Sequence, residues 1–214
     1  WVTIPHLWYR TKKLMASVEI LAQTYLAADT TSVTFSALDT TVYTYFELLS
    51  NCQSALAGSG SPGSNADYLM IRFGEADSII SANQSYSWQG QFAVDGSTGQ
   101  RATTGVYSST NSTESSWMNA GVIINQANRG TTNNNCPMNT QFFGVKSGFL
   151  SMFQSQSSIT QSGSSGANAG NSNFLGQRAT GNSAALTDIQ LLTYSGSGFE
   201  ANSSFILTGW KETV

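Results

Sequence analysis

The feature that most constrains the fold is a pair of short apolar runs near the C-terminus, separated by a turn. The first run lies within residues 186–192 and the second covers residues 205–207. Between them, residues 194–198 read YSGSG, and the two glycines tolerate the positive φ angles of a tight turn. Short apolar runs bounded by Gly and Ser predict two β-strands, and the connection predicts that they pair as a hairpin.

Strand-like runs recur along the rest of the chain. In residues 31–38 apolar side chains alternate with Thr and Ser, which predicts a half-buried strand. A turn at 39–41 leads into a second strand at 43–49, so these two are also expected to form a hairpin. Residues 15–25 fit a helix or a strand by periodicity, and the strands that follow favour a strand. Further strands are predicted at 68–73, 86–94, 101–108, 117–125, 140–152 and 174–176.

Composition supports an exposed all-β domain. Charged residues make up only 10% of the 214 residues, against about 25% in an average protein. Ser, Thr, Asn, Gln and 20 glycines supply the polarity instead, while aromatic residues at 11% argue against disorder. We therefore predict an antiparallel β-sandwich over residues 15–214, preceded by an extended arm at 1–14.

The charge balance bears on the partners. A net charge of −3 and a pI near 5.0 leave no basic face for nucleic acid, so no nucleic-acid partner is expected. No apolar run approaches the roughly 18 residues of a membrane-spanning helix, so no membrane span is expected. The sequence begins at Trp1 and has no pattern of a signal peptide, so we expect it to be part of a longer or processed product.

The C-terminal runs resemble a known family. They are similar to the C-terminal hairpin of small β-sandwich proteins from the exterior of tailed bacteriophages, of the tail-fibre, head-fibre and decoration type. Many members of that family have an aromatic residue directly before the last glycine of this hairpin. This chain has Thr208 before Gly209 and Trp210 after it. A second resemblance, to the first hairpin of that family, covers residues 32–39 and 43–48. The C-terminal positions that match are Leu186, Thr187, Ile189, Leu191, Ser195, Gly196, Phe199, Ser203, Ser204, Leu207 and Gly209.

This resemblance implies a jelly-roll-like sandwich and a place on the virion surface. It implies a non-enzymatic structural protein of the capsid or the tail, without cofactors, that contacts other virion proteins. Members of this kind are commonly symmetric multimers, so a homo-oligomer, most simply a trimer, is expected. The alternative is an adhesion module for a host receptor or surface glycan, either as a fibre tip or as a secreted lectin-like domain.

The N-terminal arm differs from the rest of the chain. It combines aromatic and basic side chains with the single histidine of the sequence. An arm of this kind either docks on a neighbouring subunit or wraps around its own sandwich, and we expect it to act as an assembly tether. The residues assigned to this role are Trp1, His6, Trp8, Tyr9, Arg10, Lys12 and Lys13.

Few residues suggest chemistry. A Ser-His-Asp triad would need His6, which lies in the arm, so no catalytic site is expected. Glu75 and Asp77 follow a core strand and would share one face if the strand continued. They fit a solvated loop, one edge of a calcium site or a glycosidase pair, and the loop is favoured. Cys52 and Cys136 fit either two free, buried thiols or one long-range disulfide, whereas a metal site lacks further ligands.

Aromatic residues give the sharper indication of binding. Trp88, Trp117, Tyr86 and Tyr107 lie among polar residues, where Trp and Tyr rings can stack on sugars. The competing interpretation places these rings in the sandwich core or at a subunit interface.

The segment Ser155–Asn173 is rich in Ser, Gly and Asn and has one large apolar residue, Ile159. A polar tract of this length predicts a long loop, which we expect to be the most mobile or most exposed part of the domain.

Overall fold

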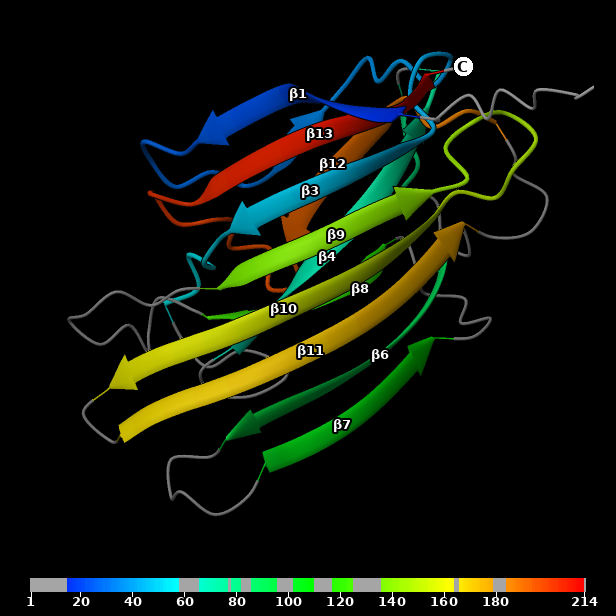
Figure 1. The fold of residues 1–214 in the computed structure, drawn as a ribbon. Coiled ribbons are helices and arrows are strands. Elements are labelled where there is room, and N and C mark those ends of the chain that lie inside the picture. Colours follow the sequence, from blue (N-terminus) through cyan, green and yellow to red (C-terminus); the bar gives the residue numbers. More distant parts are fainter. Residues whose placement is uncertain are drawn as a thin grey trace, which may run out of the picture.

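All regular secondary structure in the described part of the chain is β-strand, and the strands form two antiparallel sheets that pack face to face (Figure 1). This confirms the predicted all-β sandwich. Residues 15–25, which the periodicity left open, form a strand. The computed structural model describes residues 15–57, 66–76, 78–81, 86–95, 102–109, 117–124, 136–163, 166–178 and 184–213.

The two sheets differ in width. In spatial order the larger sheet consists of β1 (Met15–Tyr25), β13 (Ser204–Thr213), β3 (Tyr45–Asn51), β9 (Pro137–Phe143), β10 (Met152–Gly163), β11 (Gly166–Arg178), β6 (Tyr86–Asp95) and β7 (Ala102–Ser109). The smaller sheet consists of β2 (Val33–Phe35), β12 (Asp188–Thr193), β4 (Ala66–Glu75) and β5 (Ser78–Ile79), with β8 (Met118–Ile124) also paired to β4.

Eight of these strands follow the jelly-roll order. When β5, β6, β7, β10 and β11 are set aside, the larger sheet reads β1-β13-β3-β9 and the smaller reads β2-β12-β4-β8. In this order the chain changes sheet at every connection except the one from β4 to β8, which is the double Greek key of a jelly roll. The remaining strands are insertions, and four of them extend the larger sheet beyond β9 (Figure 1).

Both predicted hairpins are wrong, although their strands are right. β2 pairs with β12 in the smaller sheet, while β3 pairs with β13 and β9 in the larger one. Likewise β12 and β13 lie in different sheets. The connection between them uses positive φ angles at Gly196 and Gly198 to cross from one sheet to the other. Crossing is favoured because it sets the apolar face of one strand opposite the apolar face of the next.

The core lies between the two sheets and contains the apolar positions of the family resemblance. Rings from opposite sheets meet there, such as Phe73 and Phe142, whose centroids are 6.0 Å apart in an edge-to-face arrangement. Burying each large apolar side chain contributes about 1.5–3 kcal/mol. The fully buried members include Phe46, Leu48, Leu69, Ile71, Phe73, Phe142, Leu186, Ile189, Leu191, Phe199, Phe205 and Leu207.

The Ser-rich tract is not the exposed loop that its composition predicts. It forms most of β10 and β11, which pair along their whole length from Met152↔Gln177 to Gly163↔Gly166. Alternate serines, namely Ser155, Ser157 and Ser172, are buried between the sheets. The prediction failed because small hydroxyl side chains can fill a buried strand face when their hydrogen bonds are met.

Some of those hydrogen bonds pair strands within the larger sheet, and others join the two sheets. Thr140 and Ser155 are cross-strand partners whose hydroxyls lie 3.0 Å apart, and Ser157 and Ser172 pair in the same way. The Ser172 hydroxyl also accepts the Val122 N–H at 3.2 Å, and the Ser157 hydroxyl donates to the Val122 carbonyl at 3.4 Å. Val122 belongs to β8, which pairs only with β4 among the described strands. The serines therefore satisfy backbone groups that the smaller sheet leaves unpaired.

A buried carboxylate, that of Asp67, holds three segments of the sandwich together. Asp67 at the start of β4 accepts hydrogen bonds from the hydroxyls of Ser54 and Ser195, each at 2.6 Å. It also accepts the N–H groups of Tyr68 at 2.8 Å and Ser195 at 3.2 Å. These four donors offset the cost of burying the charge and tie the segment after β3 and the β12–β13 turn to β4.

Glycines in the inserted strands make room for rings from the neighbouring strand. Phe174 of β11 lies opposite Gly90 of β6, and a Cβ at Gly90 would come within 2.0 Å of the Phe174 ring. Phe153 covers Gly176 in the same way, at 2.3 Å. Aromatic rings laid over cross-strand glycines restore the packing that the missing side chain would provide.

We predict that Gly90→Ala lowers the free energy of unfolding by about 2 kcal/mol, because the new methyl group overlaps the Phe174 ring. Urea denaturation measures the change. The matched control is Gln89→Ala on the exposed face of the same strand, which should stay within about 0.5 kcal/mol of the parent. Equal stability of Gly90→Ala and the parent would contradict the packing described above.

Candidate functional site

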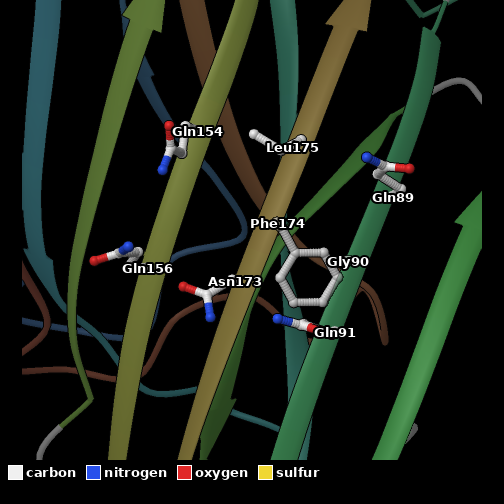
Figure 2. A pocket seen from close by; sticks show the side chains of 8 residues that line it. All are labelled: Gln89, Gly90, Gln91, Gln154, Gln156, Asn173, Phe174 and Leu175. Atoms are coloured by element: carbon white, nitrogen blue, oxygen red, sulfur yellow. The ribbon is translucent and has the colours of Figure 1, made fainter.

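The strongest candidate site is a groove on the outer face of the larger sheet, across β10, β11 and β6 (Figure 2). The strand register builds it from two rows of cross-strand neighbours. Its volume is about 540 Å³. One row is Gln154, Leu175 and Gln89, the other is Gln156, Asn173 and Gln91, and Gly90 and Phe174 complete the lining.

Uncharged amides dominate this groove. None of the eight described residues that line it carries a charge, and five carry a carboxamide group. Each carboxamide offers two N–H donors and an acceptor oxygen. In the part of the chain that the structure describes, no side-chain hydrogen bond engages these five amides, and all five residues are exposed. The groove therefore presents neutral donors and acceptors to a ligand.

A row of stacked aromatic rings lies beside the groove on the same face. Tyr45 stacks on Trp210 with centroids 5.2 Å apart and on Phe143 with centroids 5.9 Å apart. Met152 is the cross-strand partner of Phe143, is 42% exposed, and stands two residues before Gln154 on β10. Side chains two residues apart on a strand share a face, so the aromatic row continues into the amide rows. Together they combine flat apolar rings with neutral hydrogen-bonding groups.

The sequence did not single out these amides, although it carried a signal. Gln89 and Gln91 alternate with Trp88 and Gly90, and Gln154 and Gln156 alternate with serines. A period of two marks one face of a strand. That the amides of β6 and β10 lie on either side of β11 depends on the sheet order, which the sequence pattern does not contain.

Four other aromatics were proposed as ligand-stacking residues, and the three whose side chains the structure describes are buried or partly buried. Tyr86 is buried in the core, so its proposed stacking role is wrong. Trp88 is partly buried, packs against the core and lies 6.0 Å from the Phe174 ring. Trp117 is partly buried and meets Tyr194 edge to face at 6.4 Å. Tyr107 belongs to β7, and its side chain lies outside the described part.

The hydroxyl of Tyr86 is a structural hydrogen-bonding group. It accepts the Phe73 N–H at 2.9 Å and donates to the Ile80 carbonyl at 2.7 Å, with the Phe73 carbonyl also within reach at 3.0 Å. Burial raises the pKa of Tyr86 to about 12, because the phenolate would lose its hydration. The ring thereby anchors the start of β6 to β4.

The carboxylate of Glu75 binds an arginine. Arg178 at the end of β11 is fully buried and forms an ion pair with Glu75 of β4, and it also donates to the Ala184 carbonyl at 2.9 Å. This engagement does not favour the calcium or catalytic interpretation of Glu75. Asp77, its proposed companion, lies outside the described residues. No cluster of three or more His, Cys, Asp or Glu that could hold a metal occurs among the described residues.

The remaining predicted residues have mixed outcomes. Cys52 and Cys136 are both buried, and no disulfide bond joins them in this structure, so both are thiols here. The seven assembly residues of the arm, including His6, lie outside the described residues. No described segment forms a helix with the length and apolarity needed to cross a membrane.

Comparison with known proteins adds no assignment. No family model matches the chain, and no curated protein matches it either. The site is therefore interpreted from its geometry alone.

We predict that the free energy of unfolding falls at alkaline pH because the buried Tyr86 ionises. Its folded-state pKa is raised, so its contribution is complete below the unfolded value of about 10 and is lost as the pH rises toward 12. We expect the free energy of unfolding to fall by about 2 kcal/mol over this range. Tyr86→Phe should be less stable at neutral pH and should lose less as the pH rises. Urea denaturation across the range measures both, and parallel losses in parent and variant would exclude Tyr86 as the cause.

Proposed function

We propose that the protein is a non-enzymatic structural component of the exterior of a tailed phage particle, in the capsid or the tail. The observation that carries this proposal is the jelly-roll order of the strands that bear the family resemblance. Those strands include β2, β3, β12 and β13, and their matching apolar residues are core residues. Jelly rolls are recurrent building blocks of viral capsids, and the low charge of the chain suits close packing of many copies.

The polar networks support a structural role. Two buried ionisable clusters, Asp67 with its serines and Arg178 with Glu75, link strands to one another. A homotrimer is the assembly proposed for this protein, with the arm of residues 1–14 reaching other virion proteins.

The proposal predicts that the chain is found on intact particles. Antibodies raised against the purified protein should label the outside of particles of the encoding phage in immunogold electron microscopy. A variant that lacks residues 1–13 should fold with an unchanged melting temperature but should be absent from purified particles. Normal incorporation of this variant would refute the tether, while particles that lack the full-length chain would refute the virion role itself.

A second function, binding of neutral glycans, is favoured by the amide groove and the adjacent aromatic row. Amides match the paired donors and acceptors of sugar hydroxyls, and aromatic rings stack on the apolar faces of sugars. The absence of charge among the described lining residues suits an uncharged oligosaccharide. A surface protein of a particle would use such a face to contact host glycans.

Binding to an array of neutral and sialylated oligosaccharides tests this function. We expect neutral glycans to bind, and Gln154→Ala and Asn173→Ala to weaken binding roughly tenfold through lost hydrogen bonds. The matched control is Gln23→Ala, an exposed glutamine on β1 at the opposite edge of the same sheet. Binding that requires sialic acid, or that survives both groove variants, would rule out this site.

A further inference from the structure

The two cysteines lie opposite each other on neighbouring strands. Cys52 directly follows β3 and Cys136 directly precedes β9. The β3–β9 ladder ends at the pair Asn51↔Pro137, so the next residues along these antiparallel strands, Cys52 and Cys136, lie opposite each other. The Asn51 side chain accepts the Cys136 N–H at 2.9 Å, which holds the two strand ends together.

Their side chains point to the same side of the sheet. Buried residues alternate along both strands, with Ser50 and Met138 buried as the pair two positions earlier. Cys52 and Cys136 continue that inward face, and both are fully buried. Burial raises the pKa of the Cys52 thiol, and the neighbouring Cys136 raises it further, as expected for two thiols in proximity.

This arrangement suits a disulfide. Directly opposed residues of an antiparallel pair have Cβ atoms about 4.5–5.5 Å apart, whereas a disulfide needs about 3.5–4.5 Å. Strand ends that close by about 1 Å would therefore bring the sulfur atoms within bonding distance. The bond would link β3 to β9, two central strands of the larger sheet, and close a loop of about 85 residues.

We propose that Cys52 and Cys136 are a redox-active pair. A low-molecular-weight disulfide oxidises their two thiols to an intramolecular disulfide bond. One cysteine thiolate attacks the small disulfide and releases one small thiol. The second cysteine thiolate then attacks the mixed disulfide, forms the Cys52–Cys136 bond and releases a second small thiol. The protein loses two electrons and two protons, and the small disulfide gains them.

The burial of both thiols sets the rate. Exchange requires that a thiol be ionised and that the small disulfide can reach its sulfur atom. Neither condition is met while the strand ends are closed. Oxidation of the folded protein is therefore slow and proceeds through local opening of these ends. The chemistry does not rest on the virion proposal, although a protein on a released particle would leave a reducing cytosol for an oxidising environment.

Incubation of the purified full-length chain with oxidised glutathione tests the proposal. Alkylation in denaturant followed by peptide mass spectrometry should show loss of both free thiols and one linked peptide containing Cys52 and Cys136. The oxidised protein should melt roughly 5–10 °C higher than the reduced protein, and reductant should reverse the shift. A low concentration of urea should speed the reaction by promoting local opening.

Single variants supply the controls. Cys52→Ser and Cys136→Ser should each retain one alkylatable thiol, and oxidant should not raise their melting temperatures. Two thiols that stay alkylatable after oxidation in low urea would overturn the proposal. Cross-linked dimers on a non-reducing gel, in place of the intramolecular link, would overturn it as well.

Discussion

The constraint on which the structure depends is that two β-sheets must cover each other's apolar faces. The strands β3, β9 and β13 of the larger sheet and β4 and β12 of the smaller sheet each bury one face in the common core, where rings such as Phe142 and Phe73 meet. This requirement explains the jelly-roll connections. Among the eight jelly-roll strands the chain changes sheet at almost every connection, which places each new apolar face opposite the preceding one, as a series of simple hairpins would not.

The larger sheet extends beyond this shared core, and the sequence changes its chemistry where it does. Over β10 and β11 the inward residues include serines, and their hydroxyls satisfy one another and the backbone of Val122. Nearby, Gly90 and Gly176 leave space for phenylalanine rings. β8 packs closely against β10 and β11. The small inward side chains of β10 and β11 leave room for this close approach. The outer face of these strands presents the amide groove, so one extension builds both a polar interior and the candidate binding surface (Figure 2).

Much of the secondary structure was predictable, whereas the partners of each strand were not. Alternation in residues 31–38 records that one face of a strand is buried, and the structure has a strand there at Val33–Phe35. Alternation does not record which sheet covers that face, so β2–β3 and β12–β13 were expected to be hairpins. The Ser-rich tract misled for a related reason, because its low hydrophobicity suggested solvent while the hydroxyls of Ser155, Ser157 and Ser172 are paired inside the sandwich.

The sequence by itself determined that this protein is an all-β sandwich and where most of its strands lie, since local periodicity and turn residues report strands directly. Only the tertiary structure decided the order of the strands, because pairing depends on contacts between residues far apart in the chain. That order sets Gln89 and Gln154 on either side of β11, buries Tyr86, and places Cys52 opposite Cys136. The candidate site and the cysteine pair are therefore properties of the assembled sheet.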